Sequence, residues 1–269
     1  MLFTRILTAA IAGPAVVALV IVGPQWGFPV LVVLIGGVGL HEFHGLTFPV
    51  RDRSGRHFAT GVATSWTALA VAVPGGYMIA GLAAAAIAIM TFHLAKLEPI
   101  DTWGQRVGAS LAGLLYGALP MAHLCWTHAL PDGNGWRWIV MLFMVVWGGD
   151  SAAYFGGRAL GRHKLYPLAS PNKTVEGAVA GMLGAVGAAF LARAWFHGAL
   201  TVSDCVVLGL GGGILGPIGD LVQSVFKRSA GVKDSGNFFP GHGGVLDRVD
   251  ALLFTAPLFH WYAVLAAPL

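Results

Sequence analysis

Long apolar runs dominate this sequence of 269 residues and restrict it to a membrane architecture. A helix needs about 20 mainly apolar residues to cross a bilayer, and nine runs approach that length. Charged residues make up only 10% of the chain, whereas a soluble domain carries roughly 25%. We therefore predict an all-α, polytopic integral membrane protein with about nine transmembrane helices. The predicted spans are residues 6–22, 30–46, 58–73, 78–97, 107–130, 138–153, 175–196, 202–222 and 251–267.

Basic residues are distributed asymmetrically around these runs. Nine spans place 14 of the 16 lysines and arginines on one side of the membrane and only Arg137 and Arg193 on the other. Because positively charged loops stay in the cytoplasm, this predicts an N-in, C-out topology. The same loops account for the net charge of +4 without a nucleic-acid partner. Ten of the twelve acids lie on the basic side, although acids contribute little to orientation. We therefore expect a mixed-charge site at the inner membrane surface.

Residues 219–250 concentrate charge, with four of the twelve acids and four of the sixteen basic residues. Asp220 follows the glycine-rich segment 209–219, where a Gly-Pro pair is expected to loosen the helix. Where the helix continues, Asp220, Ser224 and Lys227 share one face at i, i+4 and i+7. An acid, a hydroxyl and an amine in one line form a surface suited to phosphate and metal. A simple Asp–Lys surface pair is the alternative.

Asp247 and Asp250 lie at i and i+3 at the start of the last apolar run, so both can face one point. Together with Asp220 they could hold one or two Mg²⁺ ions, because magnesium takes oxygen ligands and shares them with substrate phosphates. Carboxylates also stabilise a helix N-terminus without any metal, which is the alternative.

Glycines and basic residues fill the stretch between these acids. His242 is followed by Gly243 and Gly244, and successive backbone N–H groups freed by glycine can form an anion nest. An ordinary turn would use the same glycines. The basic side chains supply charge to phosphate, although attraction to acidic lipid headgroups would also explain them. These are Lys227, Arg228, Lys233 beside Asp234, and Arg248.

A second cluster precedes the seventh run. Asp150 and Tyr154 lie at i and i+4 at the inner end of the sixth run. Ser170 followed by Pro171 predicts the N-cap and first turn of the next helix, which would place Lys173 at a helix N-terminus, a natural phosphate seat. A capped helix with a Lys173–Glu176 pair is the alternative. The segment His41-Glu42-Phe43-His44 does not fit zinc, because its histidines are separated by three positions rather than four.

Taken together, these motifs resemble the signature of the phosphatidate cytidylyltransferases, also called CDP-diacylglycerol synthases, of the bacterial type. One departure is Gln223, where the family commonly has Glu, so we leave it out of the metal set. The resemblance covers roughly residues 147 to 250 and is carried by Asp150, Ala153-Tyr154, Ser170-Pro171, Lys173-Thr174, Glu176-Gly177, Gly219-Asp220, Ser224, Lys227-Arg228, Lys233-Asp234, Gly236, Pro240, His242-Gly243-Gly244, Asp247-Arg248 and Asp250.

The resemblance implies a magnesium-dependent nucleotidyltransferase of phospholipid biosynthesis in the cell inner membrane. It would convert CTP and phosphatidate into CDP-diacylglycerol and pyrophosphate at the cytoplasmic face, as a homodimer. Residues 1–269 would form one membrane domain, in which helices of 1–130 act as scaffold, dimer contact and lipid-facing surface, and those of 138–269 carry the chemistry.

Each candidate residue then receives a role. The metal ligands would be Asp220, Asp247 and Asp250, holding one or two Mg²⁺ ions. The catalytic set would be Asp220, Asp247, Lys227, Arg228, Lys233, Asp234 and His242. The substrate-binding set would be Asp150, Tyr154, Ser170, Asn172, Lys173, Glu176, Ser224, Gly243, Gly244 and Arg248.

Two alternatives stay open. A related CTP-dependent membrane enzyme, such as a polyprenol kinase or a cytidylyltransferase for another lipid phosphate, would share a site of cations and carboxylates. A transporter would need polar residues near the midplane of several spans, whereas the first five predicted spans are nearly free of charge in their interiors.

Overall fold

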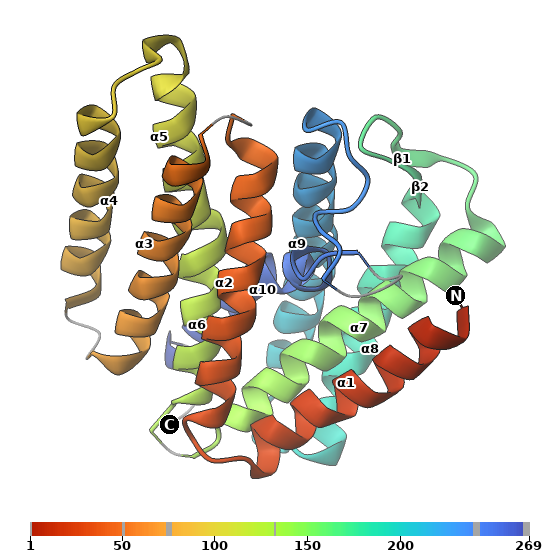
Figure 1. The fold of residues 1–269 in the computed structure, drawn as a ribbon. Coiled ribbons are helices and arrows are strands. Elements are labelled where there is room, and N and C mark those ends of the chain that lie inside the picture. Colours follow the sequence, from red (N-terminus) through yellow and green to blue (C-terminus); the bar gives the residue numbers. More distant parts are fainter. Residues whose placement is uncertain (1, 50–51, 74–76, 132, 239–242, 266–269) are drawn as a thin grey trace.

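The structure is a computed structural model that describes residues 2–49, 52–73, 77–131, 133–238 and 243–265, with side chains from Ile11 onward. The described chain is almost entirely helical, which confirms the all-α class, whereas the count of nine spans stays a prediction (Figure 1). The helices are α1 (Leu2–Val22), α2 (Gly27–Thr47), α3 (Arg53–Ala72), α4 (Met78–Ala95), the short turn η2 (Ile100–Thr102), α5 (Trp103–Ala112), the π-helical segment η3 (Gly113–Ala118), α6 (Leu119–His128), α7 (Gly135–Leu160), α8 (Val175–Trp195), α9 (Val202–Ser229) and α10 (Leu246–Leu265).

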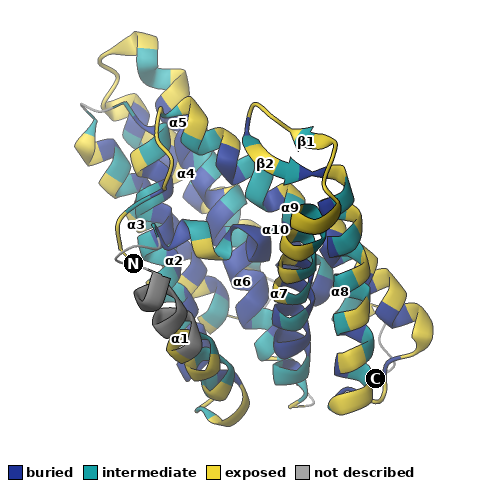
Figure 2. Cartoon of the chain, turned by 90° about the vertical axis from the view of Figure 1, so that its right-hand side faces the viewer, coloured by how far each residue is buried: buried dark blue, intermediate teal, exposed yellow. Residues whose placement is uncertain are grey.

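Six helical stretches of the described chain are long and apolar enough to cross a membrane: α2, α4, the run Ile100–His128, α7, α8 and α9. Their length and composition are those of a membrane protein. The run Ile100–His128 is the most enclosed, with 67% of its apolar window buried, whereas α4 has only 17% buried and lies at the periphery. Figure 2 shows the buried residues gathered on the inner helices.

The main core forms around α7. Its buried side chains, including Ile139, Leu142 and Val145, belong to one cluster with Ala185 and Ala189 of α8. Small residues on α8 let the two helices approach closely, because a Cβ at Gly181 would lie only 3.2 Å from the carbonyl oxygen of Gly149. The hairpin segment that follows α7 and precedes α8 is therefore attached to two closely packed helices.

The expected break at 209–219 is wrong. Helix α9 continues through this segment with Pro217 inside it. Its glycines serve packing instead, since a Cβ at Gly213 would lie 2.9 Å from the Cα of Met182 on α8, and one at Gly219 would meet the backbone of Asp250 on α10. Two neighbouring helices therefore pack closely against α9 where the sequence alone predicts a loosened turn, and the helix is continuous there.

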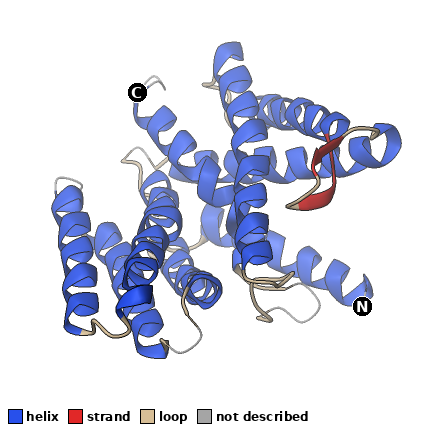
Figure 3. Ribbon diagram, turned by 90° about the horizontal axis from the view of Figure 1, so that it is seen from above, coloured by secondary structure: helices blue, strands red, loops and turns tan. Residues whose placement is uncertain are grey.

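A two-stranded antiparallel hairpin interrupts the helices between α7 and α8 (Figure 3). It consists of β1 (Lys164–Tyr166) and β2 (Ser170–Thr174), with Lys164 opposite Thr174. The predicted N-cap at Ser170 is therefore wrong, because Ser170 and Lys173 lie on β2. The N-cap of α8 is Thr174, whose hydroxyl accepts a hydrogen bond from the N–H of Gly177 at 3.1 Å. Pairing with β1 keeps the segment from Ser170 to Thr174 extended, so the helix starts later than predicted.

Candidate active site

A pocket of about 490 Å³ lies between α7, the hairpin, the start of α8 and α9. Lys173 of β2 reaches across it to Asp220 of α9, with Nζ 2.7 Å from Oδ2. The Ser224 hydroxyl donates to the other oxygen of Asp220 at 3.3 Å. Asp150, Tyr154 and Asn172 line the same pocket. The structure thus brings together candidate residues from three stretches that are separated in the sequence.

Asp247, on the first turn of α10, has partners on both oxygens. Lys227 donates to Oδ1 at 2.6 Å, and the N–H groups of Ser235 and Gly244 donate to Oδ2 at 2.9 and 3.1 Å. Burial by itself would raise the pKa of the Asp247 carboxyl, but these three hydrogen bonds outweigh it and hold the pKa below its usual range. Gly243 has φ +79°, a backbone conformation that favours glycine. Asp247 is therefore an anion that organises the surrounding backbone.

Asp250 differs from both of these acids. It is buried and accepts a hydrogen bond from the N–H of Ala251 at 2.8 Å. Within the described residues no ion pair reaches it, although the carboxylates of Asp220 and Asp150 lie within electrostatic range. Neighbouring carboxylates repel one another, and a cation between them relieves that repulsion. Oxygen donors of this kind fit Mg²⁺.

No described group of three or more acidic, histidine or cysteine side chains converges as a formed metal centre. The three candidate metal ligands, Asp220, Asp247 and Asp250, all lie within electrostatic range of the hydroxyl of Tyr116 in η3. Tyr116 donates to the side-chain oxygen of Gln223 at 3.2 Å. Gln223 is fully buried, so an acid at this position would add a fourth carboxylate to the same region.

The remaining candidates belong to neither of these two pairs. Arg228 donates to the carbonyl of Val232 at 3.2 Å, and the exposed Asp234 lines a second pocket of about 530 Å³ beside α2. Lys233 and Arg248 are exposed, whereas His242 lies outside the described residues. Glu176 does not pair with Lys173: it hydrogen-bonds His163 at 2.6 Å and accepts from the N–H of Arg162 at 3.0 Å, which ties down the base of the hairpin.

Two contributors from the first half of the chain were missed by the sequence analysis. One is Tyr116, described above. The other is Glu42 of α2, which accepts a hydrogen bond from the hydroxyl of Ser235 at 3.0 Å. A signal for Glu42 existed, because an ionisable residue inside an apolar span is costly and usually has a specific partner. No comparable signal marked Tyr116, since tyrosine is common in membrane helices.

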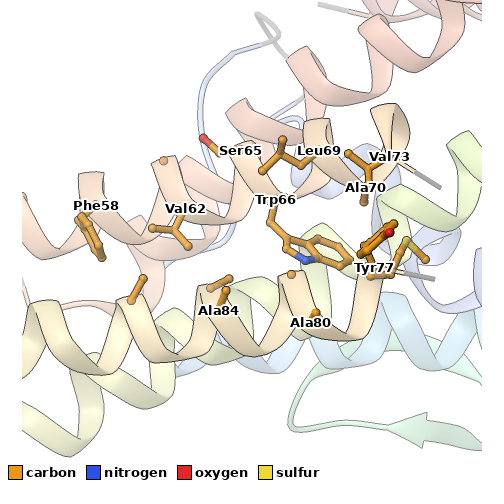
Figure 4. A pocket seen from close by; sticks show the side chains of 15 residues that line it. Phe58, Val62, Ser65, Trp66, Leu69, Ala70, Val73, Tyr77, Ala80 and Ala84 are labelled. Atoms are coloured by element: carbon orange, nitrogen blue, oxygen red, sulfur yellow. The ribbon is translucent and has the colours of Figure 1, made fainter. Parts of the chain in front are cut away.

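The largest described pocket, of about 770 Å³, lies elsewhere, between α3 and α4 (Figure 4). Phe58, Val62, Trp66 and Tyr77 line it together with small residues of α4, and no charged side chain does. A pocket of this composition offers no group for phosphate chemistry, so size does not identify the site here.

Comparison with known proteins agrees with the chemistry of these residues. A model of the cytidylyltransferase family matches residues 3–266. A phosphatidate cytidylyltransferase of Brucella suis is 37% identical over 275 residues, which cover 98% of this chain and 94% of that protein. A protein of the same name from Staphylococcus epidermidis is 41% identical over 127 residues, which cover 47% of this chain and 49% of that protein.

The fold and the paired acids and lysines describe a membrane enzyme that handles phosphate groups. With a family match that extends over nearly its whole length, the chain belongs to the cytidylyltransferase family and is a nucleotidyltransferase.

Proposed function

We propose that the protein transfers the cytidylyl group of CTP to phosphatidate, giving CDP-diacylglycerol and pyrophosphate in phospholipid biosynthesis. The names of its relatives in several genera support these substrates. The observation that carries the proposal is the Lys173–Asp220 pair, which joins the hairpin to α9 in a pocket that Asp150 and Asn172 also line. The lysine would bind the anionic phosphates of a nucleotide, and the carboxylate would bind the metal cation that accompanies them.

The chemistry follows from charge. A phosphate oxygen of phosphatidate attacks the α-phosphorus of CTP, the bond to the bridging oxygen breaks, and pyrophosphate leaves with the electron pair. Phosphatidate is already an anion, so no general base is required. Both reactants are negatively charged, so lysines and arginines must hold them together. We assign phosphate binding to Lys173 and Lys227, with Arg228, Lys233, Arg248 and His242 assisting.

We further propose that Asp220 and Asp250 hold Mg²⁺, which would neutralise charge on the nucleotide and the leaving group. Asp220 is partly exposed and Asp250 has no ion-pair partner among the described residues. Asp247 would have to exchange Lys227 for the metal, because both of its oxygens have hydrogen-bond partners. Asp150 lines the pocket with Asp220 and would assist.

The site would lie at the cytoplasmic face of the inner membrane. Each chain would cross that membrane nine times, with its N-terminus inside and its C-terminus outside, and two chains would form a homodimer. The hairpin, the end of α9 and the start of α3 all lie at one end of the bundle, at the top of Figure 1. Fourteen of the sixteen basic residues fall on this side in the nine-span topology, which supports a cytoplasmic position. Single cysteines can be placed at either end of the helix bundle and labelled in intact cells with a reagent that does not cross the membrane. The end that is labelled faces outward, which tests the proposed membrane orientation.

The decisive experiment supplies purified protein with CTP, phosphatidate and Mg²⁺. We expect pyrophosphate release that requires the lipid and stops when the metal is chelated. CTP labelled at the α-phosphorus should pass its label to the lipid, and CTP labelled at the γ-phosphorus should not. Transfer of the γ-phosphate would instead show a lipid kinase. The Asp220→Asn variant serves as the control for background turnover.

A further inference from the structure

Glu42 is an acid of α2, in the first half of the chain, yet its three hydrogen-bond donors belong to the second half. The hydroxyl of Ser235 donates to Oε2 at 3.0 Å, the N–H of Val245 to Oε1 at 3.1 Å, and the N–H of Leu246 to Oε2 at 2.9 Å. These donors lie on either side of the glycine-rich part of the motif. One carboxylate therefore ties together two segments that flank it.

The contacts of Glu42 lead directly to Asp247. Ser235 gives its hydroxyl to Glu42 and its N–H to Asp247. Leu246, the first residue of α10, precedes Asp247 in the chain. The first N–H groups of a helix have no partner inside it and favour a negative charge. Glu42 supplies that charge from another helix and so fixes the start of α10.

The glycines of the motif are a second, independent observation. A Cβ at Gly236 or at Gly244 would collide with the carboxylate of Glu42. Neither glycine has a positive φ, so backbone conformation does not explain them. Close approach to Glu42 does explain why these positions carry no side chain.

We propose that Glu42 is a positioning residue of the transfer site: it holds Ser235, Val245 and Leu246 so that Asp247 faces Lys227. This inference rests on the proposed function for its catalytic part. Glu42 itself touches neither the Lys173–Asp220 pair nor the pocket around it. Its loss should therefore lower kcat more than it changes the KM for CTP.

The test compares Glu42→Gln with Glu98→Gln, which makes the same chemical change at an exposed position. Supporting residues of this kind typically contribute about 10- to 100-fold to activity. We expect kcat of Glu42→Gln to fall by that factor while the protein still elutes as a folded species. Glu98→Gln should match the wild type. Unchanged kcat in folded Glu42→Gln would overturn the proposal.

Ser235→Ala provides a second variant that removes one of the three hydrogen bonds. Its effect on kcat should be smaller, and the double variant should lose less than the product of the two single losses, because both act through one contact. Where Glu42→Gln fails to fold, Ser235→Ala decides: lowered kcat in a folded protein supports the proposal, and unchanged kcat overturns it.

Amide hydrogen exchange separates this inference from the proposed function. Val245 and Leu246 should exchange faster in Glu42→Gln than in the wild type or in Glu98→Gln. Should the wild type show no turnover of CTP and phosphatidate, the proposed function fails, whereas faster exchange at these two amides would still establish the hydrogen bonds to Glu42. Unchanged exchange in an active enzyme would overturn the positioning role alone.

Discussion

Two aspartate–lysine pairs lie near one end of the helices, in different surroundings. Lys173 and Asp220 join β2 to α9 at the edge of a pocket, with 26% and 38% of their side chains exposed. Lys227 and Asp247 join α9 to α10 with only 12% and 8% exposed. Asp247 also has two backbone donors. We expect the first pair to be the one that exchanges with a ligand, whereas the backbone donors of the second tie it to the surrounding chain.

This difference has an energetic consequence. An exposed ion pair contributes about 0–1 kcal/mol, because water competes for both partners. Removing one partner of a buried pair costs about 3–5 kcal/mol, because the other charge stays buried and unpaired. Mutations in the two pairs should therefore separate stability from activity.

The largest effect is expected for Lys227→Met. Asp247 would lose the lysine that donates to its Oδ1, so the free energy of unfolding should fall by about 3–5 kcal/mol, and turnover should be lost. Thermal unfolding in detergent and a pyrophosphate-release assay measure the two quantities. Adding Asp247→Asn should recover part of the stability without activity. A melting temperature equal to that of the wild type would show that the second pair is not structural.

Asp220→Asn should have the opposite profile. Turnover should fall by at least about 100-fold, since a metal ligand stabilises transition-state charge by several kcal/mol. The melting temperature should change little, because the pair is partly exposed and water competes for both partners. Asp101→Asn, at an exposed position, is the matched control. Full activity in Asp220→Asn would remove this residue from the proposed site.

The sequence predicted the long helices because each apolar run is long enough to need a membrane or a core. It failed where two local patterns competed. Both Ser170-Pro171 and Thr174-Val175 suit the start of a helix. Because the segment from Ser170 pairs with β1, the helix begins only after Thr174, which is its N-cap. Glycines at 209–219 indicate a break only when no neighbour fills the space, and α8 and α10 fill it.

The site shows the same division. Its charged residues were predicted because acids and lysines are rare in this chain and crowd into residues 219–250. Which lysine meets which acid was not predictable from helical spacing: Asp220 pairs with Lys173 rather than with Lys227, seven positions along its own face. The contribution of Glu42 depends on contacts nearly 200 residues apart in sequence, which no local pattern encodes.

A smaller effect is expected for Lys173→Ala. Removing the cation from the pocket should raise the KM for CTP about tenfold, corresponding to roughly 1.4 kcal/mol of phosphate binding, with little change in melting temperature. Lys164→Ala, on the neighbouring strand outside the pocket, is the control. If both variants had the same KM, the hairpin would carry no specific phosphate contact.

The smallest effect concerns Asp52, which extends the comparison to the N-terminal helices. Burial would raise the pKa of Asp52, but the N–H of Gly55 and the ammonium of Lys96 outweigh it and lower that pKa from 3.8. The pKa of Asp52 is lower in the folded than in the unfolded state. The charged carboxylate therefore stabilises the fold above pH 3.8, and this stabilisation is lost as the pH falls through the folded pKa.

Asp52→Asn should therefore cost about 1 kcal/mol of unfolding free energy at neutral pH, and the difference from the wild type should shrink in acid. Melting temperatures of both proteins across that range measure it. Activity per folded molecule should not change, because Asp52 pairs with Lys96 and Arg106 and not with any residue of the proposed site. A stability difference that stayed constant in acid would mean that packing, and not the charge of Asp52, connects these helices.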